Sequence, residues 1–285
     1  MALKPWYNVV TPREDLREGR PLDASEFAAS LELIRSGKAS KDYSDPMTFF
    51  ERTFMTKNLT DLAAEVIRRL AGEVTETSAV FNMATQFGVG KTHALALLYH
   101  LAKNGQNANE WQGVRKLLDK AKIDSVPEAA TAIFVGTDFD AIRGRGGDDG
   151  TPLRRTPWGE IAFQLGGEEA FSVVAEHDEK LAAPAGDVIR KFLPDDKPCL
   201  ILIDELMNYV GPARRTKAAG QMYTFLLNIS EVARGRKGMV LAVSIPKSEL
   251  EMSAEDENDY QRIKHELNRL GKPVAMSTEN ETFEI

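Results

Sequence analysis

Residues 85–92 read TQFGVGKT, and their glycines, lysine and threonine are residue types that can bind a phosphate chain. The Walker A pattern G-x-x-x-x-G-K-[ST] fits these eight positions except the first, where Thr85 stands in place of glycine. Gly88 and Gly90 allow positive φ angles, so successive backbone N–H groups can turn toward phosphate oxygens. We therefore expect a working phosphate-binding loop, in which Thr85 is a tolerated change at the corner between strand and loop.

The residues that follow the glycines supply what a nucleotide phosphate chain needs. Lys91 would place a point charge on the β and γ phosphates, and the Thr92 hydroxyl would bind Mg²⁺. A helix is expected from Lys91, with its positive N-terminal end directed at the phosphates. His93 is expected to be a packing or surface residue rather than a catalytic base. The expected nucleotide-binding residues are Thr85, Gln86, Phe87, Gly88, Val89, Gly90, Lys91, Thr92 and His93.

Two adjacent acids, Asp204 and Glu205, follow the apolar run LILI at 200–203. Such a run is typical of a buried central strand, and open parallel sheets bind ligands at the carboxyl ends of their strands. This is a Walker B strand in composition and position. We expect Asp204 to accept a hydrogen bond from Mg²⁺-bound water and Glu205 to polarise the water that attacks the γ phosphate. Alone, two such acids could be solvent-facing charges, and their combination with GVGKT favours the catalytic interpretation.

Two further strands end in polar residues. The strand GMVLAVSI at 238–245 ends at Ser244, whose hydroxyl could hold the attacking water or a γ-phosphate oxygen, although it could also merely end the strand. In ATPases with this arrangement, such a strand lies between the two Walker strands. The strand TAIFVGTDF at 131–139 carries Thr137 and Asp138 near the same edge, and Asp138 is expected to cap the next turn.

These strand ends require a sheet that brings them to one edge. Short apolar strands alternate with helices from residue 78 onward, which predicts an α/β fold with a mostly parallel central sheet flanked by helices. Helices are expected from Lys91, near 216–235, and up to Leu270. The expected strands are 78–84, 131–139, 199–205, 238–245 and a short fifth strand at 272–278.

The first 72 residues show helical rather than strand periodicity, with helices expected at 25–37 and 60–72. We expect residues 1–72 to be a helical lead-in packed on a P-loop core at 73–285. Between the two helices, four apolar side chains are expected to dock on the core, with contact to adenine as the alternative: Phe49, Phe50, Phe54 and Met55.

Two other segments carry weaker predictions. Residues 143–157 read RGRGGDDGTPLRRTP, and their four arginines are expected to lie in a mobile, solvated surface loop, with contact to a partner as the alternative: Arg143, Arg145, Arg154 and Arg155. Pro157 and Trp158 are expected to enter a helix with the indole buried. Thr278 and Glu281 have the spacing of a helix capping box, and only four residues follow Glu281. Because a capped helix needs more chain than this, we expect the sequence to stop before a C-terminal lid.

Composition narrows the class of protein. The chain of 285 residues has 36 Lys and Arg against 43 Asp and Glu, and a net charge of -7 disfavours broad binding to nucleic acid or anionic membrane. The single Cys199 excludes an internal disulfide and a cysteine zinc site. No apolar run is long enough for a signal peptide or a membrane span. We expect a cytoplasmic protein.

The chain resembles AAA+/ORC-like P-loop ATPases in three stretches: GVGKTH, LILIDEL and VLAVSIPKSE. It is similar more narrowly to the N-terminal ATPase region of a large prokaryotic domain-of-unknown-function family, in PWYNVVTPREDLREGRPLDASEFAASL, DPMTFFERTFMT and RTPWGEIAFQL. Members of that family tend to sit beside DNA methyltransferases and helicases in anti-phage defence islands. The resemblance spans essentially the whole chain and implies ATP and Mg²⁺ as ligands of Gly88, Gly90, Lys91, Thr92, Asp204, Glu205 and Ser244.

The leading hypothesis is an ATP-binding, Mg-dependent ATP-hydrolysing module that drives or switches a larger assembly in anti-phage defence. Catalytic roles would fall to Lys91, Glu205 and Ser244, and metal binding to Thr92 and Asp204. The alternative is a non-hydrolysing ATP-binding scaffold that recruits partners, because no arginine finger or lid can be assigned. A small-molecule kinase is disfavoured, since Glu205 suits water activation. A homo-oligomer and DNA-modifying or helicase partner proteins fit either hypothesis, and direct contact with nucleic acid is left open.

Overall fold

A single parallel sheet organises the chain in the computed structural model, which describes Pro5, residues 9–11, 17–19, 30–83, 90–216, 218–245 and 253–275. Five strands lie in the order β2-β3-β4-β1-β5, and every neighbouring pair is parallel. The strands are β1 (Val80–Met83), β2 (Ala130–Val135), β3 (Cys199–Asp204), β4 (Met239–Ser244) and β5 (Lys272–Pro273). The predicted α/β fold with a parallel sheet is confirmed, and all five expected strands are present.

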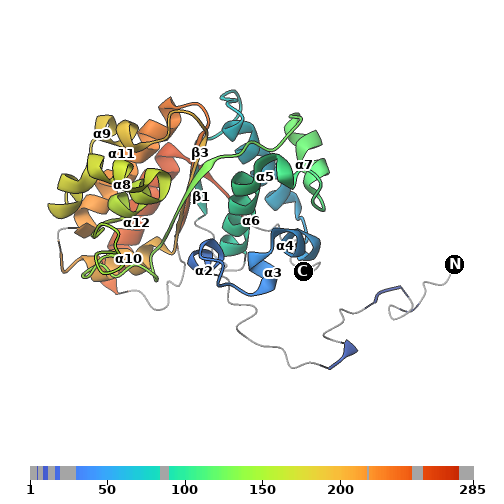
Figure 1. Ribbon diagram of the computed structural model, residues 1–285, viewed down its shortest axis with the longest axis horizontal. Coiled ribbons are helices and arrows are strands. Elements are labelled where there is room, and N and C mark those ends of the chain that lie inside the picture. The colour runs from blue at the N-terminus through green and yellow to red at the C-terminus, as the bar shows by residue number, and fades with distance from the viewer. Residues whose placement is uncertain are drawn as a thin grey trace.

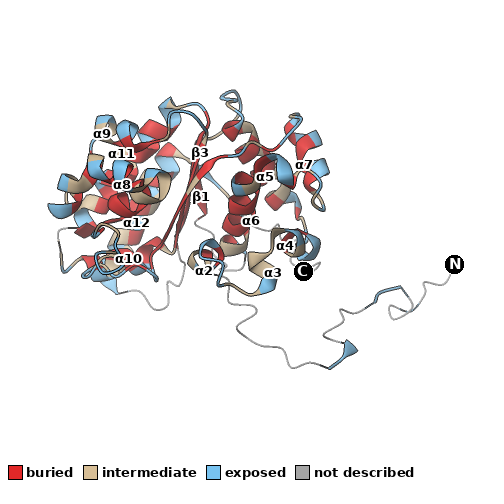
Figure 2. Ribbon diagram, in the orientation of Figure 1, coloured by how far each residue is buried: buried red, intermediate tan, exposed pale blue. Residues whose placement is uncertain are grey.

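The central strands are mostly apolar because both faces of the sheet are covered. Successive side chains of a strand point to opposite faces. In β3, Ile201 and Ile203 belong to one buried cluster, whereas Leu200 and Leu202 belong to the other. Two separate hydrophobic layers therefore sandwich one sheet, and Figure 2 shows the strands β1 and β3 as buried.

Helices cover the two faces in two sequence-contiguous groups (Figure 1). On one face lie α5 (Lys57–Leu70), α6 (Lys91–Asn104) and α7 (Val114–Ala121), with the short 3-10 helix η3 (Gly105–Ala108) after α6. The opposite face is covered by α8 (Pro157–Glu179), α9 (Gly186–Phe192), α10 (Leu206–Ala213), α11 (Ala218–Gly235) and α12 (Ala254–Leu270). The helix that begins at Lys91 and the one that ends at Leu270 agree with the sequence predictions.

Three short helices precede α5 and pack into the same cluster as α6: α2 (Leu31–Arg35), α3 (Lys41–Ser44) and α4 (Pro46–Arg52). Asp45 caps α4 by accepting a hydrogen bond from the Thr48 N–H, and Pro46 occupies its first turn. Phe49 and Phe50 are fully buried, as predicted, but Phe54 is 58% exposed, so the core-docking prediction is wrong for that residue. The proposed boundary at residue 72 stays a prediction.

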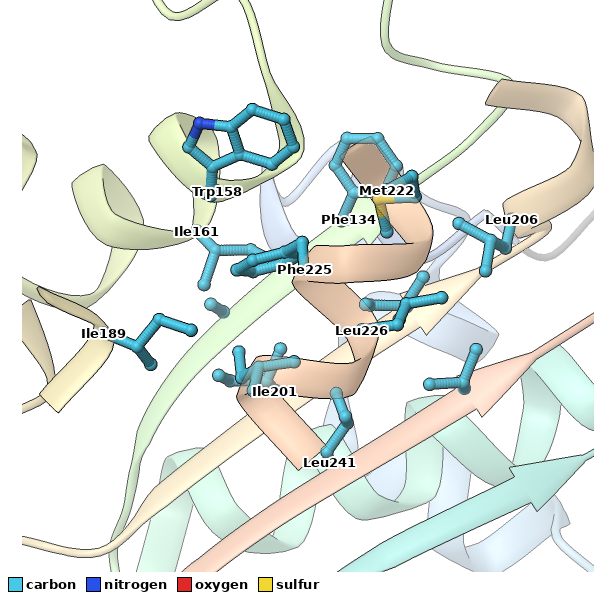
Figure 3. Close-up of a cluster of buried hydrophobic side chains, with 14 of the residues drawn as sticks. Phe134, Trp158, Ile161, Ile189, Ile201, Leu206, Met222, Phe225, Leu226 and Leu241 are labelled. Atoms are coloured by element: carbon cyan, nitrogen blue, oxygen red, sulfur yellow. The ribbon is translucent and has the colours of Figure 1, made fainter. Parts of the chain in front are cut away.

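The cluster on the other face is built around α8 and α11 (Figure 3). Thr156 caps α8 by accepting a hydrogen bond from the Gly159 N–H, and Pro157 fits the first turn. Trp158 is completely buried, and its ring lies 5.6 Å from that of Phe225. The buried indole anchor predicted for the start of this helix is confirmed.

The segment before α8 differs from its prediction. Residues 145 and 154 form a short antiparallel bridge, and Arg154 is only 3% exposed. Its Nε lies 2.8 Å from Glu160 Oε2, and its guanidinium lies over the Phe163 ring. The solvated-loop prediction therefore holds for Arg143 and Arg155, which are exposed, but is wrong for Arg154 and for Arg145, which is partly buried and paired with Glu32 and Glu160. A buried arginine is stable here because a buried carboxylate pairs with it.

The outer edge of β2 is covered by a side chain of α8. Gln164 Oε1 accepts a hydrogen bond from the Ile133 N–H at 2.8 Å, and Gln164 Nε2 donates to the Ile133 carbonyl at 2.7 Å. The same amide group donates to Glu160 Oε1. At the opposite edge, β5 is only two residues long, and the predicted capping box at Thr278 and Glu281 lies outside the described residues.

Candidate functional site

Three strand ends meet at the carboxyl edge of the sheet, and their side chains face α6. Ser244 pairs with Met83 at the end of β1, and β3 lies on the other side of β4. Even-numbered residues of β3 and β4 point into the cluster that contains α6, as Leu202 and Ala242 do. The same period of two brings Asp204 and Ser244 to that face. The strand that ends at Ser244 does lie between the strands that lead to Lys91 and Asp204.

The first residues of the helix α6 lie next to the carboxyl edge of the sheet. Gly90 has φ 92°, a left-handed conformation that favours glycine, and α6 starts at the next residue. Lys91 is 5% exposed, and its Nζ donates a hydrogen bond to the Ile245 carbonyl at 3.1 Å. A buried ammonium group is unfavourable without polar partners. Lys91 therefore spans from the start of α6 to the end of β4, close to Ser244.

The two halves of the predicted site are joined by a hydrogen bond. Thr92 Oγ1 donates to Asp204 Oδ2 at 2.8 Å, although the two residues are 112 positions apart. The Ser244 hydroxyl also hydrogen-bonds to the Asp204 carboxylate, and the Glu205 N–H donates to Asp204 Oδ1 at 3.0 Å. Burial raises the pKa of Asp204, while the hydrogen bonds from Ser244 and Thr92 act in the opposite direction.

This arrangement fits a small divalent cation better than a fully protein-ligated metal. Thr92 and Asp204 present one hydroxyl and one carboxylate, which are oxygen ligands of the kind that Mg²⁺ binds. Within the described ranges, no cluster of three or more His, Cys, Asp or Glu side chains could hold a metal ion. Mg²⁺ keeps several waters and uses few protein ligands beside substrate phosphates, so a hydroxyl and a carboxylate are ligands of the number and kind that it uses.

Glu205 has a different environment from that of Asp204. Its backbone is left-handed, with φ 52° and ψ 42°, and α10 begins at the next residue. Its Oε2 accepts hydrogen bonds from Thr137 Oγ1 at 2.9 Å and from Asn208 Nδ2 at 3.3 Å. Thr137 follows β2, on the side of β3 that faces away from β4 and β1. The two adjacent acids therefore have partners on opposite sides of β3.

The turn after β2 is pressed against the backbone of Glu205. The Gly136 N–H donates to the Asp204 carbonyl at 2.9 Å, which extends the β2–β3 ladder by one residue. A β-carbon at Gly136 would overlap the Glu205 carbonyl oxygen, so only glycine fits. The sequence predicted that Thr137 lies near the carboxyl edge of the sheet. Its contact with Glu205 could not be predicted, because it depends on the pairing of β2 with β3.

Asp138 does not cap the next turn as predicted. Its Oδ2 accepts a hydrogen bond from the Ser30 hydroxyl at 3.1 Å. The turn is capped by Asp140, whose Oδ1 accepts from the N–H groups of Ile142 and Arg143 at 2.8 and 2.9 Å. An acid two or three residues before the capped N–H groups fits this turn better than Asp138 does.

His93 packs against α4, in agreement with its predicted packing role. Its ring centroid lies 4.6 Å from that of Phe49, and its Nε2 lies 3.0 Å from Thr53 Oγ1. Burial lowers the pKa of His93 to about 4. A neutral imidazole held between α4 and α6 supports the start of α6. The other predicted nucleotide-binding residues, Thr85, Gln86, Phe87, Gly88 and Val89, lie outside the described residues.

A separate groove of about 240 Å³ lies between α5 and the strands β1 and β5. Its walls include Asn58 and Asp61 from α5 and Phe81 from β1. An ion pair of Lys272 Nζ with Glu65 Oε2 at 2.5 Å crosses it. None of the predicted site residues lines this groove, so the contacts described above are independent of it.

Comparison with known proteins places the chain in a family. Residues 7–277 match the family described as the DUF499 N-terminal domain. No curated protein and no solved structure matches the chain. In the part of the chain that the structure describes, no helix is both long enough and apolar enough to cross a membrane. Because the family match spans well over half of the sequence, the chain belongs to the DUF499 N-terminal domain family.

Proposed function

We propose that the chain is an AAA+-like P-loop module that binds ATP and hydrolyses it with Mg²⁺. The observation that carries this proposal is the hydrogen bond between Thr92 and Asp204. It brings the hydroxyl after a GxGK sequence to the acid at the end of a buried parallel strand, which is the pairing that magnesium-dependent phosphoryl transfer needs. The position of β4 between β1 and β3 supports the same assignment.

The roles of the side chains follow from their positions. Lys91 would bind the β and γ phosphates, and Thr92 and Asp204 would hold Mg²⁺, which supplies charge neutralisation on the phosphate oxygens. Water would attack the γ phosphorus while the bond to the bridging oxygen breaks, and Glu205 would take the proton. Ser244 is buried beside Asp204 and would orient that carboxylate or a γ-phosphate oxygen.

The test measures binding and turnover separately. ATP affinity is measured by equilibrium titration with Mg²⁺, and hydrolysis is measured by phosphate release. Lys91→Ala is expected to abolish binding, and Glu205→Gln to preserve binding but abolish turnover. Lys103→Ala serves as the matched control, since Lys103 is exposed near the end of the same helix. Near-wild-type binding by Lys91→Ala would refute the proposal, as would phosphate release no faster than that of Glu205→Gln.

A non-hydrolysing ATP-binding scaffold is the second candidate, and the position of Glu205 favours it. Its carboxylate is bound to Thr137 and Asn208, on the side of β3 away from β4 and β1. Two side-chain hydrogen bonds therefore occupy the carboxylate that hydrolysis would need as a base. Tight ATP binding with no phosphate release, in the presence of candidate partners, would establish this alternative.

The cellular setting is proposed from the family resemblance. A module that drives or switches a larger assembly in anti-phage defence would act with DNA-modifying or helicase proteins, as a monomer or a homo-oligomer. A cytoplasmic location fits the single cysteine, because Cys199 has no second cysteine with which to form an internal disulfide. Co-purification of the tagged protein with products of neighbouring genes, with and without ATP, tests the partner assignment.

A further inference from the structure

The turn that carries Thr137 is held by an arginine from the segment before α8. Arg145 Nη2 donates a hydrogen bond to the Asp138 carbonyl at 2.9 Å. Arg145 Nη1 lies 3.2 Å from Glu160 Oε1 and 3.2 Å from Glu32 Oε2. One guanidinium group therefore connects the turn after β2 to α8 and to α2.

The two anchors of Arg145 differ in strength. Glu160 is buried and is also bound by Arg154 and Gln164, so this anchor is fixed in the core. Glu32 lies on α2, a helix of five residues that also carries Arg35. Ser30, the N-cap residue of α2, also contacts this turn directly, because its hydroxyl donates to Asp138 Oδ2 at 3.1 Å. The more exposed of the two carboxylates that bind Arg145 is therefore on α2, which is held in the core by Leu31 and Ile34.

The same turn also contacts Glu205 through Thr137. Thr137 directly precedes Asp138, and its hydroxyl donates to Glu205 Oε2 at 2.9 Å. The turn is close to the main chain of residue 205, because a β-carbon at Gly136 would overlap the Glu205 carbonyl oxygen. A change at Asp138 would therefore be felt at the Thr137–Glu205 hydrogen bond.

We propose that Arg145 is a positioning residue that, together with the N-terminal end of α2, fixes the turn after β2 and so holds Glu205 on the β2 side of the site. The proposal rests on the proposed ATPase function for its effect on turnover. Docking of α2 on the turn would keep basal hydrolysis slow. Displacement of α2 would release Glu205 toward the phosphate side.

The experiment weakens the α2 contacts without leaving Glu160 unpaired. The double variant Ser30→Ala/Glu32→Gln removes the hydrogen bond from Ser30 to Asp138 and the charge that pairs with Arg145, and Glu51→Gln on α4, an exposed position, is the matched control. Turnover of the double variant at saturating ATP should rise about twofold, less than direct loss of the Thr137–Glu205 hydrogen bond would give, while ATP affinity stays at the wild-type value. Arg145→Lys should give a smaller rise, since its amine keeps the charge but cannot bridge three partners. Turnover that is unchanged or slower in the double variant would overturn the proposal.

Amide hydrogen exchange separates this proposal from that of the ATPase function. The reporters are the N–H of Gly136, which is bonded to the Asp204 carbonyl, and that of Asn208, which is bonded to the Glu205 carbonyl. Faster exchange at both in the double variant, without nucleotide, supports the coupling even if the wild-type protein hydrolyses no ATP. Exchange that matches the wild type and Glu51→Gln would refute the coupling, whatever the turnover.

Discussion

Asp204 and Glu205 are neighbours in the sequence, yet the structure gives them different surroundings. Asp204 is 2% exposed and is held by Thr92 of α6 and Ser244 of β4, both anchored in the core. Glu205 is partly exposed, has a left-handed backbone and is held by a turn and by the first turn of α10. The comparison separates a fixed half of the site, suited to metal and phosphate binding, from an adjustable half, suited to controlling water activation.

The largest effect is expected from a change in the fixed half of the site, at Asp204. Asp204→Asn removes the charge that would face Mg²⁺ but keeps the shape of the side chain. We expect the affinity for ATP with Mg²⁺ to fall about 100-fold, and the affinity for ATP without Mg²⁺ to change little. Isothermal titration with and without Mg²⁺ measures both. An equal loss under the two conditions would show that Asp204 is structural rather than a metal ligand.

The variant Gly136→Ala tests the close contact between the turn after β2 and the main chain of Asp204 and Glu205. The added methyl group must displace the Glu205 backbone, so we expect the free energy of unfolding to fall by about 2 kcal/mol. Urea denaturation measures the change. Gly220→Ala is the control: Gly220 lies within α11 with no atom close to an added β-carbon, so this variant should be unchanged or slightly more stable. Equal stability of the two variants would contradict the close approach at Gly136.

A smaller effect is expected at the adjustable half. Thr137→Val has almost the same shape but cannot donate to Glu205, so basal ATP turnover should rise about threefold with unchanged ATP affinity. Thr131→Val, near the start of the preceding strand β2, is the control. Phosphate release at saturating ATP measures the difference. Slower turnover in Thr137→Val would mean that this hydrogen bond places Glu205 for catalysis instead of holding it back.

The smallest effect concerns the packing of α6 against the short helices α3 and α4. His100 is buried against Phe49, and burial lowers its pKa, while its Nε2 lies 2.8 Å from the Tyr43 carbonyl. Below about pH 6.5 the unfolded chain binds a proton at His100 more readily than the folded chain does, so the free energy of unfolding should fall as the pH decreases.

His100→Gln keeps a donor for Tyr43 but does not titrate, and it should make this acid-induced loss of stability shallower. Denaturation series from pH 7 to pH 5 on wild type, His100→Gln and His265→Gln provide the comparison, since His265 is exposed on α12. If His265→Gln reduces the acid sensitivity and His100→Gln does not, the burial of His100 is not its cause.

The sheet and the fixed half of the site were predictable because their causes are local. Continuous apolar runs mark buried parallel strands, and the residues that end them, Asp204 and Ser244, must then lie at one edge. The start of α6 at Lys91 follows in the same way from the glycines before it. What could not be predicted was the direction in which each acid faces, since this depends on which strand pairs with each side of β3.

The errors have a common physical origin, which is pairing between distant residues. Arg154 looked solvent-facing because it lies in a glycine-rich, charged stretch, but a carboxylate six residues later is buried with it. Asp138 looked like a turn cap because the sequence does not show that Asp140 caps this turn instead. Nor does it show that Asp138 binds Ser30, which is 108 residues away. Phe54 looked like a core residue from its neighbours, although α4 has ended before it.

The amide of Gln164 has a consequence for assembly. By bonding both main-chain groups of Ile133, this one side chain takes the place that a sixth strand would occupy beside β2. An unprotected edge of a parallel sheet is a template for strand addition by another chain. A second copy could extend the sheet here only by displacing Gln164, which would also strip Glu160 of a hydrogen-bond donor. Association of subunits by strand addition at the β2 edge is therefore disfavoured, and this edge of the sheet stays as it is on assembly.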